Sequence, residues 1–220
     1  MLVVFDLDGT LVDSSQDLAN SGNALLRSYG APPVPDADVV ALVGEGAREL
    51  VRRLLERQRV GVPLNHALAR FLALYDARLT ATTRPYDGVP DMLQATSRVA
   101  RLAVLTNKPG RLSNKLLEAL DLRRYFATVI GGDADDVPRK PDPAGLRRLV
   151  TDAGVPAART LMVGDSPADA KTAAAAGVPL CLARYGFGFA KVSNDDRALA
   201  AHEVAHPSEI TAIVSRLTAS

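Results

Sequence analysis

The chain begins Met1-Leu2-Val3-Val4-Phe5-Asp6-Leu7-Asp8-Gly9-Thr10, in which an unbroken apolar run stops at two aspartates. A short apolar run without alternation is typical of a strand buried on both faces of a parallel sheet. In open parallel sheets, ligands bind beyond the carboxyl ends of the strands. Asp6 and Asp8 therefore stand where such a sheet would carry its site, and Gly9 and Thr10 add free backbone N–H groups and a hydroxyl.

Four more apolar runs of this kind follow, at residues 102–105, 129–130, 161–163 and 178–182. Helical patterns lie between them, at residues 112–120, 143–153 and 167–176. Strands that alternate with helices of about ten residues indicate β-α-β units. The sequence therefore predicts an α/β fold built on a parallel sheet.

Residues 16–81 interrupt this alternation, because their apolar residues follow a helical spacing and form no convincing strand. The spacing is clear from Leu18 to Tyr29, and proline-containing stretches at residues 31–35 and 61–63 separate the helical segments. We therefore expect an all-helical insert between the first strand and the rest of the sheet.

The composition excludes several classes of protein. With 26 Lys and Arg against 25 Asp and Glu, the formal net charge is +1, which gives no electrostatic reason to expect a nucleic acid or an anionic membrane as a partner. Cys181 is the single cysteine, so neither an intramolecular disulfide nor a cysteine metal cluster can form. No basic segment precedes the first apolar run, and no apolar stretch reaches the about 18 residues of a spanning helix. We therefore expect a cytoplasmic protein.

A second acidic cluster follows the run at residues 161–163. Asp165 stands at the strand end, and Asp169 falls in the first turn of the next helix. Either cluster alone fits an ordinary turn or a helix cap, for which one acid is enough. Two acidic strand ends in one parallel sheet can converge on a single cation, and Mg²⁺ prefers a few carboxylates together with water and phosphate oxygens. The two clusters together therefore favour a functional site.

Two further segments carry groups that suit a phosphate. Thr106 and Asn107 follow a strand and can donate hydrogen bonds to an anionic oxygen, although such residues also end strands as turn formers. Lys140 precedes two prolines and can offset the charge of nearby carboxylates; the alternative is a solvated surface lysine. A carboxylate nucleophile needs such a set: a second carboxylate to protonate the leaving oxygen and activate water, and cations to neutralise the phosphoryl oxygens.

The order of these motifs resembles the haloacid dehalogenase-like superfamily of aspartyl-phosphate phosphatases, over nearly the whole chain. The segment from Phe5 to Ser14 is similar to the first motif of that superfamily, which implies that Asp6 is the nucleophile and Asp8 the general acid and base. Thr106 matches the phosphate-binding hydroxyl of the second motif, and Lys140 matches the lysine of the third.

The resemblance also implies a metal site. Asp165 and Asp169 match the acidic residues of the fourth motif. In the superfamily, Mg²⁺ is held by the carboxylate of the nucleophile, the backbone carbonyl of the second aspartate and a fourth-motif aspartate. The metal residues that we expect are Asp6, Asp8, Asp165 and Asp169.

The fold implied by the resemblance is a Rossmann-like α/β core with a mobile helical cap of the C1 type. The core domain is expected at residues 1–14 and 84–220. The cap domain is expected at residues 15–83, which contain the helical insert.

Within the superfamily, Asp8 favours phosphate-ester chemistry, since its dehalogenases and phosphonatases lack this second aspartate. The pattern is most similar to phosphoglycolate phosphatases, whose Gly-x-Gly cap helix resembles residues 42–50. Backbone N–H groups beside two glycines can approach an anion, and an arginine can hold a carboxylate with two hydrogen bonds. The alternatives are a plain helix start and a solvated helix face. The substrate-binding residues implied are Asn107, Gly44, Glu45, Gly46 and Arg48.

These features predict a Mg²⁺-dependent phosphomonoester hydrolase that works through an aspartyl-phosphate, with 2-phosphoglycolate as the leading substrate. Alternatives within catalysis are a phosphatase for a sugar phosphate, a sugar-acid phosphate or pyrophosphate, and a phosphomutase. A non-catalytic binding module is an alternative of another class, which the four motifs oppose. The expected partner is a small phosphorylated metabolite, with no nucleic acid and no membrane, and the expected state is a monomer or a homodimer.

Overall fold

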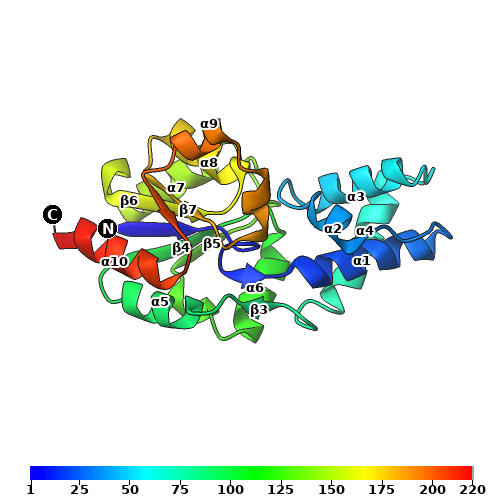
Figure 1. Cartoon of the computed structure of the whole chain (residues 1–220), viewed down its shortest axis with the longest axis horizontal. Coiled ribbons are helices and arrows are strands. Elements are labelled where there is room, and N and C mark those ends of the chain that lie inside the picture. The colour runs from blue at the N-terminus through cyan, green and yellow to red at the C-terminus, as the bar shows by residue number, and fades with distance from the viewer. Residues whose placement is uncertain (220) are drawn as a thin grey trace.

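The computed structural model describes residues 1–219 as a parallel sheet covered by helices, with a helical insert beyond one end of the strands (Figure 1). The six strands lie in the order β5-β4-β1-β6-β7-β8. Each neighbouring pair is parallel. The predicted α/β class is therefore confirmed. The strands are β1 (Leu2–Phe5), β4 (Arg101–Leu105), β5 (Thr128–Ile130), β6 (Thr160–Gly164), β7 (Leu180–Ala183) and β8 (His202–Val204).

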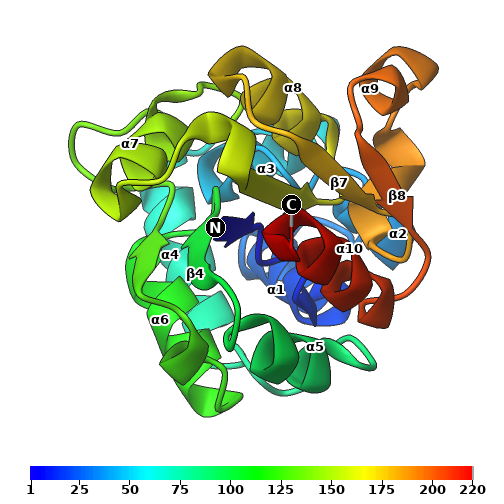
Figure 2. The same cartoon turned by 90° about the vertical axis from the view of Figure 1, so that its left-hand side faces the viewer.

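Alternate residues of the central strands feed two hydrophobic cores, because side chains along a strand point to opposite faces. Val3 and Phe5 belong to one core, and Leu2 and Val4 belong to the other. Figure 2 shows the helices that cover the two faces. The first core takes in α5 (Val89–Thr96), α6 (Gly110–Ala119) and α10 (Ser208–Ala219). The second takes in α7 (Ala144–Ala153) and α8 (Pro167–Ala176). Burial on both faces explains the unbroken apolar runs.

Several short elements differ from the sequence expectations. β8 was not predicted, because only Val204 of its three residues is buried. The run predicted from Val178 enters the sheet only at Leu180, since Pro179 has no N–H for the ladder. The helices α5 and α10 and the short helix α9 (Asn194–Ala198) were not predicted either. No helix within residues 1–219 has the length and apolarity that crossing a bilayer requires.

The insert consists of four helices packed on one another. α1 contacts each of the other three, and α3 and α4 also contact. The apolar spacing that predicted these helices corresponds to buried residues, among them Leu25, Leu54 and Phe71. The helices are α1 (Ser15–Ser28), α2 (Asp36–Val40), α3 (Ala47–Arg57) and α4 (Leu64–Asp76).

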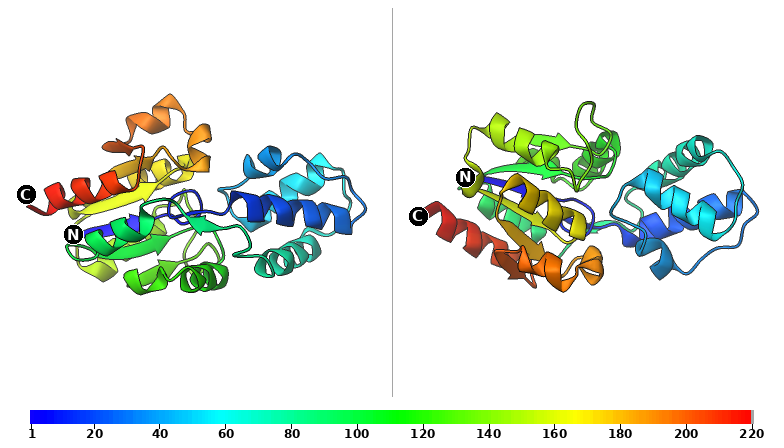
Figure 3. Two further views of the ribbon diagram at one scale, coloured as in Figure 1. Left: turned by 60° about the horizontal axis from the view of Figure 1, so that its bottom comes forward. Right: turned by 90° about the horizontal axis from the view of Figure 1, so that it is seen from above.

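Figure 3 shows that the insert stands beyond the strand ends and is joined to the sheet by two passages of the chain. These passages pair as the antiparallel strands β2 (Val12–Asp13) and β3 (Arg84–Pro85). The expected domain boundaries at residues 14–15 and 83–84 fall at this pair, and the division into two domains stays a prediction.

A buried carboxylate fastens the two passages together. Asp17, in the first turn of α1, accepts hydrogen bonds from the backbone N–H groups of Thr82 (2.9 Å) and Thr83 (2.8 Å). It also accepts one from the Thr83 hydroxyl (2.7 Å). Burial on its own would raise the pKa of Asp17, but these hydrogen bonds to the charged form outweigh it and lower the pKa. The ionised side chain thus fixes where the insert leaves and rejoins the sheet.

We expect Asp17→Asn to lower the free energy of unfolding by about 1–3 kcal/mol near neutral pH. A neutral amide oxygen accepts these hydrogen bonds more weakly than a carboxylate does, and the amide NH₂ group faces the Thr82 N–H as donor against donor. Since the folded pKa lies below the ordinary value of 3.8, the Asp17 contribution is complete above that value and is lost as the pH falls through the folded pKa. Urea unfolding near pH 7 and near pH 3 measures the free energy of unfolding of both proteins. The difference between variant and wild type should be smaller at the lower pH. The exposed control Asp135→Asn should show no gap; a gap for Asp17→Asn that does not change with pH contradicts the assignment.

Candidate active site

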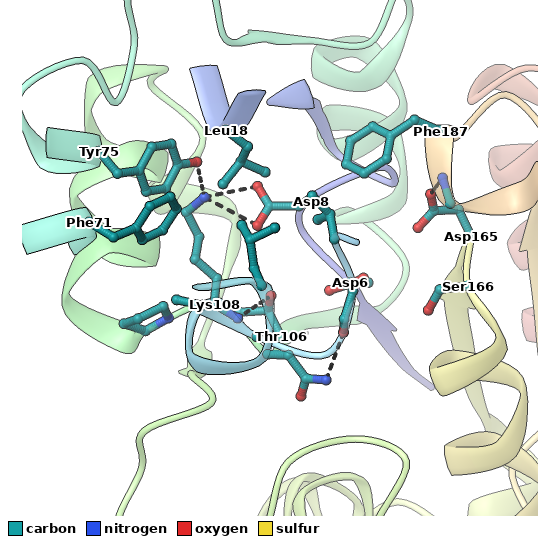
Figure 4. Close-up of a pocket in the computed structure, with 18 of the residues that line it drawn as sticks. Asp6, Asp8, Leu18, Phe71, Tyr75, Thr106, Lys108, Asp165, Ser166 and Phe187 are labelled. Atoms are coloured by element: carbon teal, nitrogen blue, oxygen red, sulfur yellow. Dashed lines mark hydrogen bonds and ion pairs between the residues drawn. The ribbon is translucent and has the colours of Figure 1, made fainter. Parts of the chain in front are cut away.

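Three neighbouring strands deliver polar residues to one edge of the sheet, facing the insert. β1 runs into Asp6, β4 runs into Thr106 and β6 runs into Asp165. The register pairs Phe5 of β1 with Val104 of β4 and with Val163 of β6, so the three strands end side by side. Figure 4 shows these side chains around one pocket.

Three of the predicted acidic residues converge. Carboxylate oxygens of Asp6, Asp165 and Asp169 lie within 4.8 Å of one another, and all three residues are buried. Burial raises the pKa of Asp6 to about 6, against the lowering effect of Lys140, and the charge of Asp169 adds to the rise. Burial, followed by the charges of Asp6 and Asp169, raises the pKa of Asp165 well above its ordinary value. Both shifts mean that these buried carboxyl groups are costly to ionise unless positive charge lies close to them.

Lys140 supplies positive charge to this carboxylate cluster. Its Nζ lies 2.8 Å from Asp6 Oδ1 and 2.7 Å from Asp169 Oδ1. Burial alone would lower the pKa of Lys140, but the charges of Asp169 and Asp6 outweigh burial and raise it, so the ammonium stays charged. Three carboxylates against one ammonium leave an excess of negative charge on oxygen ligands. Such a donor set fits a hard divalent cation.

Asp169 and Asp165 also have fixed partners within the protein. Asp169 Oδ2 accepts hydrogen bonds from the backbone N–H (3.0 Å) and the hydroxyl (2.6 Å) of Ser166, which completes the N-terminal capping box of α8. The helix-cap alternative and the site interpretation thus apply to the same residue. Asp165 accepts from the Thr10 hydroxyl (3.2 Å) and from the Gly188 N–H (2.7 Å).

Glycines allow the chain to crowd around Asp165. Gly9 has a φ of +92°, and a Cβ there would lie 2.0 Å from an oxygen of the Asp165 carboxylate. A Cβ on Gly186 would lie 2.1 Å from the Gly9 carbonyl oxygen. A side chain at either position would displace the loop or the carboxylate.

The Asp8 carboxylate lies apart from the cluster and faces the insert. It accepts a hydrogen bond from the Ser14 hydroxyl (2.6 Å) and forms an ion pair with Lys108, whose Nζ lies 2.9 Å and 3.1 Å from its two oxygens. The Lys108 ammonium also donates to the hydroxyl of Tyr75 on α4 (Figure 4). Of the four residues expected at the metal, three carboxylates therefore converge; for Asp8 the resemblance implied only the backbone carbonyl.

Lys108 and Tyr75 were not among the predicted site residues. Lys108 is one of only five lysines in the chain and directly follows Thr106-Asn107, which was the available signal. Tyr75 fitted the apolar spacing of its helix, and its side chain is indeed buried. The Tyr75 hydroxyl reaches Lys108 because α4 lies over the end of β4. The spacing of apolar residues does not indicate how α4 is placed relative to β4.

Asn107 connects three parts of the site. Its side-chain amide donates to the carbonyl of Lys140 and to the carbonyl of Gly44 in the insert, both at 2.9 Å. Its Oδ1 accepts from the Lys140 N–H at 2.9 Å. Because both amide hydrogens have protein partners in this arrangement, Asn107 positions Lys140 and holds the insert. Thr106 is buried and lines the pocket with its hydroxyl accepting from the Lys108 N–H (3.2 Å).

The cap residues expected at the substrate separate into two pairs. Gly44 and Gly46 line the pocket, whereas Glu45 and Arg48 are exposed and do not. Glu45 forms an ion pair with Arg53 (2.7 Å), and Arg48 donates to the Asn65 side chain (2.9 Å). The reason is helical periodicity: Ala47 and Leu50 present the pocket face of α3, and Arg48 points to another face.

The pocket is a cavity of about 60 Å³ between the strand ends and the insert. Its floor is acidic and its insert side is apolar. The lining residues are Asp6, Asp8, Leu18, Val43, Gly44, Gly46, Ala47, Leu50, Phe71, Leu72, Tyr75, Thr106, Asn107, Lys108, Pro109, Asp165, Ser166, Phe187 and Gly188.

In this arrangement the Asp6 carboxylate lies beside the Lys140 ammonium and belongs to a carboxylate cluster that could hold a cation. A second carboxylate, that of Asp8, stands two residues further along the chain. Such a set can attack an electrophilic centre, stabilise developing negative charge and move a proton. Residues 3–183 match the model of the haloacid dehalogenase-like hydrolase family.

The chain belongs to the haloacid dehalogenase-like hydrolases.

Two relatives of this haloacid dehalogenase-like hydrolase and one solved structure are informative. A phosphoglycolate phosphatase of Rhodospirillum rubrum is 43% identical over 193 residues, which cover 84% of this chain and 80% of the relative. Phosphoglycolate phosphatase 1 of Pseudomonas aeruginosa is also 43% identical over 193 residues, covering 84% and 70%. The crystal structure of a predicted phosphoglycolate phosphatase from Haemophilus somnus has a TM-score of 0.88 at 27% identity and covers 96% of both chains.

We expect MgCl₂ to raise the melting temperature of the metal-free hydrolase more near pH 7.5 than near pH 5.5. With a pKa of about 6, Asp6 is mainly protonated at the lower pH, and the anionic form that binds a cation grows as the pH rises. Thermal unfolding with MgCl₂ or EDTA measures the shift. Asp165→Asn should lose most of it, and the exposed control Asp135→Asn should keep it. A shift that is unchanged in Asp165→Asn contradicts this metal site.

Proposed function

We propose that this chain is a Mg²⁺-dependent phosphomonoester hydrolase that works through an aspartyl-phosphate on Asp6, with 2-phosphoglycolate as its leading substrate. The position of Asp6 carries the proposal. Asp6 follows the central strand β1, and one of its carboxylate oxygens lies 2.8 Å from the Lys140 ammonium. Its carboxylate also lies within 4.8 Å of oxygens of Asp165 and Asp169. A phosphoryl group there would meet a nucleophile together with groups that stabilise its charge. Membership of the hydrolase family and the names of the relatives support phosphatase activity.

Asp6 makes the first attack in the proposed reaction. One carboxylate oxygen of Asp6 bonds to phosphorus while the bond from phosphorus to the ester oxygen breaks. Lys140 keeps the neighbouring Asp6 and Asp169 carboxylates compatible with an incoming anion. The Thr106 hydroxyl, which lines the same pocket, donates to a phosphoryl oxygen.

Asp8 moves the proton. It lies on the same turn as Asp6 and faces the insert, which is the side towards which a leaving group would extend. Asp8 protonates the departing alkoxide, then takes a proton from the water that hydrolyses the aspartyl-phosphate. Ser14 and Lys108 hold its carboxylate in one orientation for both steps.

We expect Asp6 and Asp165 to hold Mg²⁺ together with the Asp8 backbone carbonyl. The Lys140 ammonium already neutralises Asp169, whereas Asp165 accepts its hydrogen bonds from neutral groups, the Thr10 hydroxyl and the Gly188 N–H. When bound, the cation supplies positive charge next to the phosphoryl oxygens. The protein contributes two buried carboxylates, Asp6 and Asp165, that already lie close enough together to hold the cation.

A small ester suits the pocket best. The insert covers the pocket with apolar side chains such as Leu50 and Phe71, which offer no hydrogen-bond partners to the hydroxyls of a sugar. 2-Phosphoglycolate therefore leads, ahead of sugar phosphates, sugar-acid phosphates, pyrophosphate and phosphomutase chemistry. The small phosphorylated metabolite as partner, the monomeric or homodimeric state and the cytoplasmic location stay predictions.

Phosphate release from 2-phosphoglycolate with Mg²⁺ tests the proposal. We expect 2-phosphoglycolate to exceed glucose 6-phosphate and pyrophosphate, and EDTA to stop the reaction. Asp6→Asn should reduce turnover by at least about 10⁴-fold, because an amide neither attacks phosphorus nor binds the cation as well. Circular dichroism should show the variant folded. Appreciable turnover by folded Asp6→Asn removes Asp6 from the nucleophile role.

The role of Asp8 predicts a dependence on the leaving group. Asp8→Asn should reduce kcat for 2-phosphoglycolate by about 10²–10⁴-fold, because its alkoxide leaves poorly without a proton. The loss for p-nitrophenyl phosphate should be much smaller in the step that releases the phenolate. Rapid-quench measurement of that release separates it from the later hydrolysis. Equal losses for both esters contradict a general-acid role.

A further inference from the structure

The pocket contains an asymmetric distribution of charge. Every insert residue that lines it is apolar apart from the Tyr75 hydroxyl and the glycine backbone. Among the lining residues, which all belong to the described part of the chain, Lys108 alone carries a positive side chain. Arg48, expected from the sequence at the substrate, is exposed and bonded to Asn65. An anionic group on the leaving-group side would therefore find its counter-ion in Lys108.

Lys108 is a buried and well-defined cation. Its side chain is only 3% exposed, and Nζ contacts Asp8 of the sheet edge and Tyr75 of the insert. Burial alone would lower its pKa, but the charge of Asp8 and the contact with Tyr75 outweigh burial and raise it. Burial raises the pKa of Tyr75 to about 12, so its hydroxyl stays protonated and able to donate. The Lys108 ammonium and the Tyr75 hydroxyl are therefore two adjacent hydrogen-bond donors.

The position of this pair selects a kind of leaving group. If Asp8 protonates the ester oxygen, a group two bonds beyond that oxygen comes within reach of Lys108, because Lys108 Nζ lies 2.9 Å from Asp8. In 2-phosphoglycolate the carboxylate carbon stands at that distance. The apolar residues around it, such as Leu18 and Phe71, leave the hydroxyls of a sugar without hydrogen-bond partners.

We propose that Lys108 and Tyr75 form the subsite that binds a carboxylate on the leaving group, and that they set the preference for small phosphorylated hydroxy acids. The inference rests on the proposed phosphatase function. Because Lys108 follows β4 and Tyr75 lies on α4, the carboxylate is bound jointly by the sheet edge and the insert. Recognition of the substrate thus favours the arrangement in which the insert covers the site.

The test compares two esters of similar size, 2-phosphoglycolate and ethyl phosphate, of which only the first carries the carboxylate. The measured quantity is the ratio of their kcat/KM values with Mg²⁺. Lys108→Met should reduce this ratio by about 30- to 100-fold, the loss of a hydrogen-bonded charge pair. Tyr75→Phe, which removes one hydroxyl and keeps Lys108, should reduce it by about 5-fold. The exposed control Lys171→Met should leave the ratio unchanged.

The ratio separates substrate recognition from an effect on Asp8, because disturbing Asp8 slows both esters alike. Equal losses for both esters in Lys108→Met overturn the subsite. If Lys108→Met does not fold, an unchanged ratio in folded Tyr75→Phe overturns it as well. If Arg48→Met lowers the ratio of kcat/KM values and Lys108→Met does not, Arg48 binds the carboxylate and the proposal is overturned. Wild-type enzyme that hydrolyses ethyl phosphate without preferring 2-phosphoglycolate retains phosphatase activity and refutes the subsite, whereas hydrolysis of neither ester refutes the proposed function itself.

Discussion

Excess negative charge at the carboxyl ends of β1 and β6 is the constraint on which the site depends. Carboxylate oxygens of Asp6, Asp165 and Asp169 lie within 4.8 Å of one another. Burial first, and then the charge of neighbouring carboxylates, raises the pKa values of Asp6 and Asp165. Lys140 offsets one charge, and hydrogen bonds from nearby loops stabilise the rest. What remains is an unmet demand for positive charge. A divalent cation bound there, as in the proposed function, would supply that positive charge.

The insert completes the site through a few polar contacts in an otherwise apolar surface. Asp17 fixes its two connections to the sheet, while Asn107 bonds the Gly44 carbonyl and the Lys191 ammonium donates to the Val43 carbonyl. These contacts place apolar side chains over the acidic floor of the pocket. They also bring the Tyr75 hydroxyl to Lys108, the contact on which the proposed carboxylate subsite rests.

The sequence was sufficient for the parallel α/β fold and the helical insert, because strands buried on both faces read as apolar runs and end at acidic residues. Asp6, Asp165 and Asp169 were correctly expected to meet, since the topology of a parallel sheet brings strand ends together. Arg48 shows the limit: its position in the chain suggested the pocket, but the face it occupies depends on how α3 packs. Lys108 and Tyr75 show the same limit, because their contact joins residues 33 positions apart on two different layers.

Trapping an acyl phosphate would test whether the buried Asp6 carboxylate forms a bond to phosphorus. The enzyme is mixed with 2-phosphoglycolate and Mg²⁺, quenched with acid within milliseconds, digested and examined by mass spectrometry. We predict a phosphoryl group on the peptide that contains Asp6, and conversion of Asp6 to homoserine when the quenched protein is treated with borohydride. A phosphoryl group on any other residue would contradict it. So would phosphate release with inversion at a chiral phosphorus, which indicates direct attack by water.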